Sequence, residues 1–504
     1  MPNKYLAFDL GAESGRAILG TLRRDRISLT EIHRFTNSPV MQDGHLRWQA
    51  DRLLGELQQG LARAAQQGHR DLAALGIDTW GVDFGLLDRH DRLLENPVAY
   101  RDARTNGMVA RAFELMPAAE LYARTGIQIM PINTLYQLLS LVETKAPVLA
   151  AAERLLFMPD LFNFLLTGSK AAEYSIASTS QLLDATTKTW APEIFARLNL
   201  PLRLMPPVIR PGTKLGKLLP AFAGATGLHQ AEVIACGGHD TACAVAAIPA
   251  AVHNWAYISS GTWSLVGVER AQPLLDERGR RFNFTNEGGL NNRIRLLRNT
   301  MGLWLLQRCR KDWAAAGERH DYAELVALAA RAPAFRSLID PDAPVFINPD
   351  NMPQAIADFC RQTQQAPPED KGGFVRTILE SLAFRYRFII ERLNAVSAEP
   401  VAVIHLVGGG SQNELLNQFT ADATGLPVLA GPVETTALGN VISQAIACGE
   451  IAHFDEGRTL VRNSFPLKEY WPRETERWSE VYHKIEPLLR SSGVNGEPQP
   501  NQST

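Results

Sequence analysis

The first part of the chain alternates short apolar runs with polar turns. Residues 5–8 form an apolar run that ends at Asp9, and residues 16–19 and 27–32 form two more. Glycine and short polar residues fill positions 11–15, as is typical of a tight turn. This pattern predicts a meander of three strands with its first turn at residues 11–15.

A helix and a fourth strand follow the meander. Residues 51–67 carry leucine at helical spacing, and Gly68 is the residue type that commonly follows a helix end. Residues 74–77 are an apolar run that leads into the polar residues 78–83. The predicted order is therefore three strands, a helix and a strand.

The second half of the chain repeats this order. Residues 255–258 and 263–266 predict two strands joined by a turn at residues 259–262. A long helix near residues 373–393 then precedes an apolar strand at residues 401–407. We interpret the repeat as two related domains that face each other.

The two first turns align with each other. The offset that separates Gly11 from Gly261 also separates Ser14 from Ser264. Their alignment supports the duplication, with a chance match of two short turns as the alternative. We predict domains at residues 1–245 and 246–490.

The C-terminal end predicts a helix and a tail. The segment 468–489 carries aromatic and apolar side chains that should pack as a terminal helix; they are Trp471, Trp478, Tyr482 and Leu488. Residues 491–504 are mainly small and polar and have little to bury, so we expect a disordered tail there.

Composition excludes several classes of protein. The chain has 504 residues, 45% hydrophobic and 21% charged, which is enough apolar material for a large core and excludes wholesale disorder. Its 51 basic and 53 acidic residues give a net charge of -2, so nothing predicts binding to nucleic acid or to an anionic membrane. The most apolar stretch, residues 155–166, is interrupted by Pro159 and is too short to cross a bilayer.

The cysteines and the first residues predict a cytoplasmic protein. The five cysteines form no CxxC pair, so neither a disulfide framework nor a structural zinc site is expected; they are Cys236, Cys243, Cys309, Cys360 and Cys448. The chain begins with four residues that run directly into the first strand, without the pattern of a signal peptide. A homo-oligomer is left open.

Three glycine-rich turns are candidates for nucleotide binding, although none has the P-loop or dinucleotide pattern. The first two lie between strands, where backbone N–H groups, Ser14, Arg16 and Thr262 would surround an anion; plain hairpin turns are the alternative. The third, residues 408–413, follows a strand and precedes a helix, where a flat ring could lie on the glycines. A buried strand-to-helix turn is its alternative.

Two aspartates next to these turns have the chemistry of phosphoryl transfer. Asp9 ends the first strand, and a carboxylate among phosphate-binding amides is repelled unless a cation such as Mg²⁺ lies between them. Asp240, in the turn at residues 237–241, could accept the proton of an attacking hydroxyl. The alternatives are a turn-capping Asp9 and Asp240 as the N-cap of a helix over residues 242–247.

Residues 78–83 combine two carboxylates, a hydroxyl and an indole, the mixture that binds a sugar with polar edges and an apolar face. The alternative is a turn with a core tryptophan. Residues 101–104 and Asn299 are weaker polar candidates, and His239 by itself is more often a hydrogen-bonded structural residue.

Four of these segments together resemble the FGGY carbohydrate kinases: residues 8–16, 237–240, 259–262 and 408–413. The resemblance extends from about residue 4 to 490. It implies an α/β fold of two actin-like (ribonuclease H-like) ATPase domains with an ATP and sugar cleft between them, the first domain on the sugar and phosphate side and the second on the nucleotide side.

Five further stretches resemble the branch of this family that phosphorylates the 1-hydroxyl of L-rhamnulose in L-rhamnose degradation; they are residues 76–84, 100–107, 133–138, 158–160 and 299–307. The resemblance implies that Asp240 accepts the proton of that hydroxyl and that Asp9 lies near Mg²⁺. It implies sugar contacts from Gly81, His239, Asp240, Thr241 and Asn299. It implies ATP contacts from Ala12, Glu13, Ser14, Gly15, Arg16, Thr262, Gln307 and Gly409.

The first turn departs from the pattern of the family. Many members carry a hydroxyl residue after the position of Gly11, whereas this chain has Ala12 and then Glu13. We expect Ser14 to supply the hydroxyl. The competing hypotheses are a kinase for another ketose, such as L-fuculose or L-xylulose, and a non-enzymatic ATP clamp on the same fold.

Overall fold

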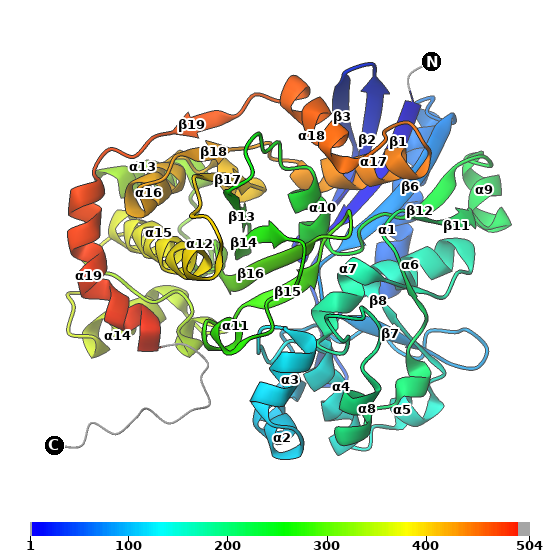
Figure 1. Cartoon of the computed structure of the whole chain (residues 1–504), viewed down its shortest axis with the longest axis horizontal. Coiled ribbons are helices and arrows are strands. Elements are labelled where there is room, and N and C mark those ends of the chain that lie inside the picture. The colour runs from blue at the N-terminus through cyan, green and yellow to red at the C-terminus, as the bar shows by residue number, and fades with distance from the viewer. Residues whose placement is uncertain (1–2, 492–504) are drawn as a thin grey trace.

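The computed structural model describes residues 3–491, so the predicted tail lies, from residue 492 onward, outside the described residues. Two large sheets dominate the structure, and helices cover both (Figure 1). This is the two-domain α/β architecture predicted from the sequence.

The first sheet has six strands in the order β11-β12-β6-β1-β2-β3. Its strands are β1 (Asn3–Leu10), β2 (Ser14–Arg23), β3 (Arg26–Thr36), β6 (Leu72–Thr79), β11 (Thr213–Lys217) and β12 (Glu232–Ala235). β1 is antiparallel to β2 and parallel to β6. The predicted meander and fourth strand are confirmed.

The second sheet has seven strands in the order β15-β16-β14-β13-β17-β18-β19. Its strands are β13 (Trp255–Ser260), β14 (Trp263–Arg270), β15 (Thr285–Gly288), β16 (Ile294–Met301), β17 (Val403–Val407), β18 (Val428–Ala430) and β19 (Lys468–Tyr470). β13 is antiparallel to β14 and parallel to β17, as β1 is to β2 and β6.

The two sheets share one plan. The order β3-β2-β1-β6-β12 in the first sheet corresponds to β16-β14-β13-β17-β18 in the second, with the same strand directions. The repeat of elements predicted from the sequence is therefore present. The division of the chain near residue 245 stays a prediction.

Helices bury both faces of the first sheet. α1 (Ala50–Gln66), which confirms the predicted helix, packs on Leu6 and Phe8, while α17 (Thr435–Ala447) packs on the opposite face at Tyr5 and Ala7. Because alternate residues of β1 meet two apolar layers, the strand is apolar at four successive positions, residues 5–8.

The crossing of two helices is one of the contacts between the halves. α10 (Asp240–Ala246) packs against α17 at Gly439, where an added Cβ would lie 1.8 Å from the carbonyl oxygen of Cys243. Only glycine permits this approach. The crossing fixes α10, whose first residue is Asp240, between the two sheets.

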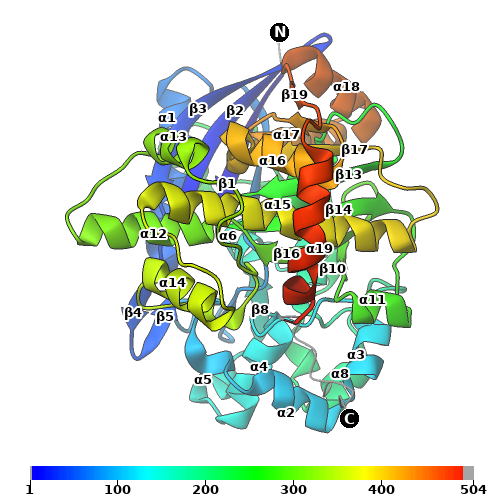
Figure 2. The same cartoon turned by 90° about the vertical axis from the view of Figure 1, so that its left-hand side faces the viewer.

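The second sheet packs on α15 (Lys371–Val396), the helix predicted near residues 373–393. Figure 2 shows α19 (Thr475–Ser491) crossing α15.

The terminal helix predicted from residue 468 therefore starts later than expected. Residues 468–470 are instead strand β19 paired with β18, and Pro472 disfavours helical backbone before it. Trp471, expected to pack, is 60% exposed.

The remaining elements complete the two halves. The small ladders pair β4 (Val40–Gln42) with β5 (His45–Arg47), β7 (Phe84–Leu87) with β8 (Arg154–Phe157), and β9 (Ala172–Glu173) with β10 (Val208–Ile209). Helices of the first half are α2 (Met108–Leu115), α3 (Ala118–Thr125), α4 (Thr134–Glu143), α5 (Pro147–Ala151), α6 (Met158–Thr167), α7 (Tyr174–Ala177), α8 (Pro192–Arg197) and α9 (Pro220–Thr226). Those of the second half are α11 (Glu277–Arg281), α12 (Trp304–Ala315), α13 (Tyr322–Arg331), α14 (Met352–Gln362), α16 (Glu414–Thr424) and α18 (Phe454–Ser464). Among residues 3–491, no helix combines the length and apolar character needed to cross a membrane.

Candidate functional site

A cavity of about 340 Å³ lies where the two sheets, α10 and α17 meet. Most of the residues predicted for the site line it; they are Asp9, Ala12, Glu13, Ser14, Arg16, Gly81, His239, Asp240, Thr241, Thr262, Asn299, Gln307 and Gly409. The structure thus brings together segments that are far apart in the sequence.

Gly15 is the predicted site residue that does not line the cavity. It follows Ser14 on β2, so its Cβ position points to the other face of the sheet, where an added Cβ would lie 2.1 Å from the ring of Phe35. The glycine is required by this packing. Its predicted contact with ATP stays a prediction.

The two hairpin turns present backbone donors to the cavity. In the first turn the carbonyl oxygens of Gly11 and Glu13 accept bonds from Asn37 at 2.9 and 2.8 Å. In the second, the carbonyl oxygen of Thr262 accepts from Gly302 N–H at 3.1 Å. Within residues 3–491 no hydrogen bond uses the backbone N–H of Ala12, Glu13 or Thr262. Such unengaged amides in a turn are the donors that an anion-binding site needs.

The third turn packs against the second hairpin. An added Cβ on Gly410 would lie 2.1 Å from Ser260 Oγ, whereas nothing lies within 4 Å of the Cβ position of Gly409. Gly409 therefore borders open space in the cavity. Gln307, on α12, contributes a buried side-chain oxygen that has no partner among the described residues.

Carboxylates gather at the carboxyl ends of β1 and β6. Asp9 Oδ2 lies 2.7 Å from Arg16 Nη2, and Arg16 Nη1 lies 2.5 Å from Glu434 Oε2. Burial raises the pKa of Asp9 to about 6; Arg16 opposes this, and the charges of Asp240 and Glu434 add to it. Burial, with the neighbouring Asp9, also holds the pKa of Asp78 well above its usual value.

Asp240 occupies the first position of α10, after the N-cap residue His239. Its Oδ1 accepts from Thr241 N at 2.5 Å and from Thr241 Oγ1 at 3.0 Å, and lies 3.4 Å from His239 Nε2. The side chain is 29% exposed, so the carboxylate reaches the cavity. Asp240 is not the N-cap that the alternative hypothesis assumed.

The segment at residues 78–83 contributes less to the cavity than its composition suggested. Trp80 and Gly81 line it. Asp83 is fully buried and accepts from Trp48 Nε1 at 2.7 Å, Trp80 Nε1 at 2.9 Å and Tyr100 N at 3.1 Å. Asp83 therefore orients indoles rather than a ligand, and burial raises its pKa to about 6.

Glu13, the residue that departs from the family pattern, faces the opposite hairpin. The side chain is exposed, but desolvation by the walls of the cleft raises its pKa, against a hydrogen bond from Thr262 and the charge of Arg101. The Arg101 guanidinium lies 4.1 Å from the ring centroid of Trp304 and donates to the carbonyl oxygen of Ile347 at 3.3 Å. This side chain thus connects the two halves beside the cavity.

Sequence reasoning missed a polar network behind His239. Glu287 lines the cavity, and Arg295 lies behind it with no exposed surface. Gln128 Oε1 accepts from Asn299 N at 2.8 Å and from Asn299 Nδ2 at 3.1 Å. One feature of the sequence could have indicated this network: Arg295 is a charged residue among the apolar residues of β16.

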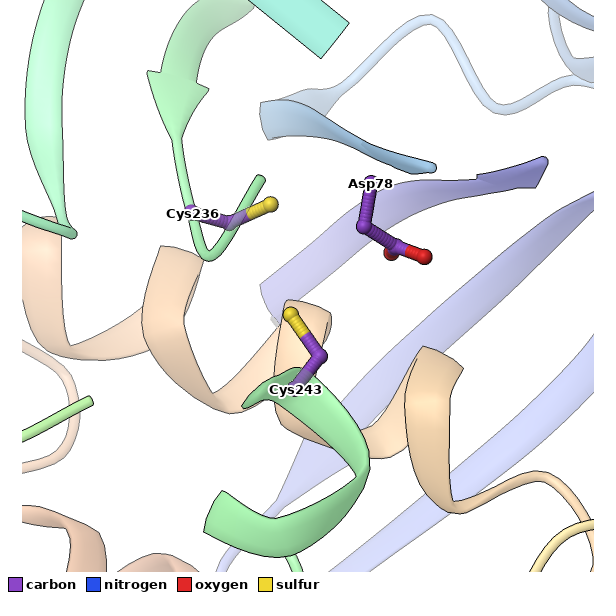
Figure 3. A group of neighbouring side chains, drawn as sticks. All are labelled: Asp78, Cys236 and Cys243. Carbon is purple, nitrogen blue, oxygen red and sulfur yellow. The ribbon is translucent and has the colours of Figure 1, made fainter. Parts of the chain in front are cut away.

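A second group of ligand-type atoms lies beneath the cavity. The side chains of Asp78, Cys236 and Cys243 point toward one another (Figure 3), with their ligand atoms within 4.8 Å. However, Cys243 Sγ donates to the Gly237 carbonyl oxygen at 3.2 Å, and burial raises the pKa of that thiol. Asp78 Oδ2 accepts from Asn440 at 2.6 Å. These contacts fit neutral hydrogen-bonding groups rather than a metal centre, in line with the predicted free thiols.

Comparisons with known proteins extend over almost the whole chain. Sequence models of the FGGY family of carbohydrate kinases match residues 4–247 (N-terminal domain) and 256–448 (C-terminal domain). A rhamnulokinase of Bacteroides thetaiotaomicron is 45% identical over 97% of this chain and 100% of its own length. A rhamnulokinase of Enterococcus faecalis is 42% identical over 97% of this chain and 98% of its own. The crystal structure of gluconate kinase from Lactobacillus acidophilus superposes with a TM-score of 0.79 at 17% identity, covering 98% of this chain and 99% of that one, which shows a shared fold.

Proposed function

The chain belongs to the FGGY family of carbohydrate kinases, and we propose that it transfers the γ-phosphate of ATP to the 1-hydroxyl of L-rhamnulose. It is a sugar kinase with ATP as co-substrate. L-Rhamnulose as the sugar substrate is supported by relatives named rhamnulokinase that match nearly end to end at 42–45% identity.

The observation that carries the proposal is the position of the Asp240 carboxylate. It opens into the same cavity as the two hairpin turns and the sugar candidates Gly81 and Asn299. A hydroxyl bound there can give its proton to Asp240 while its oxygen attacks the γ-phosphate. In phosphoryl transfer such a base mainly orients the nucleophile and takes the proton late. Thr241 holds the carboxylate through Oδ1.

The two hairpins would hold the phosphates of ATP between them. The free backbone N–H groups of Ala12, Glu13 and Thr262 supply donors, and Ser14 and Arg16 add side-chain donors. Gly409 leaves room for the nucleoside on the side of the second sheet. Closure of the halves around these groups would exclude water from the γ-phosphate.

The carboxylates near Asp9 fit a divalent cation. Neighbouring negative charges, that of Asp240 among them, add to burial in raising the pKa of Asp9 and Asp78, and Arg16 is shared between Asp9 and Glu434. Mg²⁺ with one or two carboxylate ligands and phosphate oxygens would offset that repulsion, and Asp9 is the residue we assign to it. When bound, Mg²⁺ neutralises charge on the phosphates that react.

An apolar wall in the cavity suits a deoxy sugar. The apolar side chains of Trp80, Ile127, Met130 and Ile132 line the same cavity as Gly81. L-Rhamnulose carries a methyl group at C6, which apolar side chains can cover at no cost in hydrogen bonds. Such a wall selects against a smaller pentulose by about 10- to 100-fold.

The compartment we propose is the cytoplasm. Among the described residues all five cysteines are free, which fits a reducing environment. ATP as co-substrate agrees with this.

ADP release by the purified protein tests the proposal. The assay supplies Mg·ATP with L-rhamnulose, L-fuculose, L-xylulose and D-xylulose in parallel, and ³¹P–¹H NMR locates the new phosphate ester. We expect a strong preference for L-rhamnulose, with phosphate on C1. Preference for another ketose would reject the substrate but not the kinase. No sugar-dependent ADP release from a protein that binds ATP would reject the role of Asp240 and favour the clamp.

A further inference from the structure

A buried ion pair in the second sheet contacts the first half of the molecule. Glu287 on β15 and Arg295 on β16 are opposite each other in register, and their side chains are joined by a 3.1 Å contact between Oε2 and Nη2. Arg295 Nε also donates to the Gly288 carbonyl oxygen at 3.0 Å. Removing two charges from water costs free energy, so a buried ion pair adds little stability by itself. The other groups that contact this ion pair therefore indicate its role.

The partner that belongs to the other half is His239. Arg295 Nη2 lies 3.0 Å from His239 Nδ1, and Glu287 Oε2 lies 3.3 Å from the same nitrogen. The second ring nitrogen, Nε2, lies 3.4 Å from Asp240 Oδ1. One nitrogen of His239 thus meets the ion pair, and the other faces the carboxylate that we assign as the base.

The Arg295 contact, the shorter of the two at Nδ1, favours one position for the proton of the imidazole. A guanidinium group has five donors and no acceptor. Its hydrogen bond to Nδ1 therefore requires the lone pair of that nitrogen, which leaves the proton on Nε2 of a neutral ring. Glu287 balances the charge of Arg295 and keeps the guanidinium in place, and the charge of Arg295 works against burial to hold the pKa of Glu287 at about 2.

We infer that Arg295 and Glu287 are positioning residues that hold His239 as an Nε2–H donor toward Asp240 and the sugar. The inference rests on the proposed function for its kinetic part only. A donor at Nε2 can bind a sugar hydroxyl without competing with Asp240 for the proton of the 1-hydroxyl. Without Arg295, Nδ1–H would donate to Glu287, and Nε2 would become a second acceptor beside the base.

The contact also depends on the arrangement of the two halves. His239 precedes α10, whereas Glu287 and Arg295 belong to the second sheet. If the sheets move apart, His239 loses the partner that fixes its proton. The position of the His239 proton is therefore tied to the contact between α10 and the second sheet.

Nitrogen NMR of ¹⁵N-histidine-labelled protein tests the assignment without any substrate. The signals of His239 are identified as those missing in His239→Gln. We expect Nε2–H in the wild type and Nδ1–H in Arg295→Met. A wild-type Nδ1–H form, or an unchanged tautomer in Arg295→Met, would overturn the inference.

Arg298→Met is the matched control, since Arg298 is a buried arginine of the same strand that donates to the Phe282 carbonyl oxygen instead. It should unfold as easily as Arg295→Met and leave the His239 tautomer unchanged. A tautomer change in this control would assign the effect to general loosening and reject the specific role.

Kinetics give the second readout. Arg295→Met should raise the KM for the ketose about two- to tenfold, the loss expected for one hydrogen bond between neutral groups, and leave the KM for ATP unchanged. Arg295→Lys, which keeps a charged donor, should recover part of the loss. Equal rises in both KM values would contradict the inference. The measurement uses whichever ketose the wild type prefers, so a wrong substrate assignment does not affect it.

Discussion

The two hairpins that face each other across the cavity have the same backbone plan and different side chains. In the first, Asp9 and Arg16 are opposite each other in register, and Glu13 lies in the turn. In the second, the equivalent register pair is Ser259 and Leu265, which carries no charge. Both turns leave backbone N–H groups without a partner in the described chain.

The serines of the two hairpins show how far the duplication extends. Ser14 lines the cavity, whereas Ser264 is fully buried and shares a 2.7 Å hydrogen bond with Tyr386 Oη. The second turn is one residue shorter than the first, so in strand register Ser264 corresponds to Gly15, which also faces away from the cavity, and the counterpart of Ser14 is Trp263. The predicted alignment of Ser14 with Ser264 is therefore wrong. The backbone plan thus supplies phosphate donors twice, and of the two hairpins only the first carries charged side chains at its turn and at the register pair compared here.

Removing the base should have the largest effect. Asp240→Asn keeps the size of the side chain and its contact with Thr241, but it cannot accept a proton. We expect turnover to fall about 10²- to 10⁴-fold, with little change in the affinity for ATP and ketose. Stopped assays of ADP release and calorimetric titration measure the two quantities. Near-wild-type kcat would remove Asp240 from this role.

Neutralising Asp9 tests whether the charge of the first hairpin serves a cation. Asp9→Asn should raise the Mg²⁺ concentration for half-maximal activity about 10- to 100-fold. Glu434 still pairs with Arg16 in this variant, so the fold should persist. An unchanged Mg²⁺ dependence would contradict the assignment.

The same variant has a signature in stability. Folding raises the pKa of Asp9 from 3.8 to about 6, so the folded state binds more protons than the unfolded state between these values. The contribution of Asp9 to stability is therefore present below pH 3.8 and is lost as the pH rises through about 6. Urea titrations without Mg²⁺ should show this slope in the wild type and a weaker one in Asp9→Asn. Equal slopes would mean that Asp9 does not titrate in this range.

The order of elements could be predicted because both sheets have apolar strands at fixed positions between glycine turns. The apolar run at residues 5–8 is buried on both faces, and its short length and the glycine turn after it, rather than any alternation, identified it as a strand. The strand at residues 468–470 could not be predicted, because only its pairing with β18 makes it a strand.

The candidate site was predictable only in part. Turn residues such as Gly261 and Asp240 follow apolar runs, so the sequence alone indicates that they lie near strand ends. Asp83 was misjudged because its carboxylate turns inward to Trp48, a residue distant in the sequence. Glu287 and Arg295 were missed because their role depends on a contact with His239, which lies in the other half of the molecule.

Adding bulk to the second hairpin tests the phosphate role of the uncharged turn. An added Cβ on Gly261 has no neighbour closer than 3.8 Å, so Gly261→Val should fold normally with its side chain in the cavity. We expect the KM for ATP to rise about tenfold or more, because a small displacement of a reacting group is costly. Gly55→Val in α1, where the Cβ position is also open, is the control. An unchanged KM for ATP would separate this hairpin from the nucleotide.

The smallest expected effect concerns Glu13, the charge that distinguishes the first turn from the second. Glu13→Gln keeps a partner for Thr262 and removes a negative charge beside the phosphate donors. We expect the KM for ATP to fall about two- to fivefold at low ionic strength, and the difference should shrink as salt screens the charge. Glu31→Gln, which removes an equal charge from an exposed pair with Arg34 on β3, is the matched control. A rise in the KM for ATP in Glu13→Gln would show that this carboxylate helps to bind the nucleotide, either through a cation or through Arg101. Every charged residue of the first hairpin named here would then contribute to ligand binding.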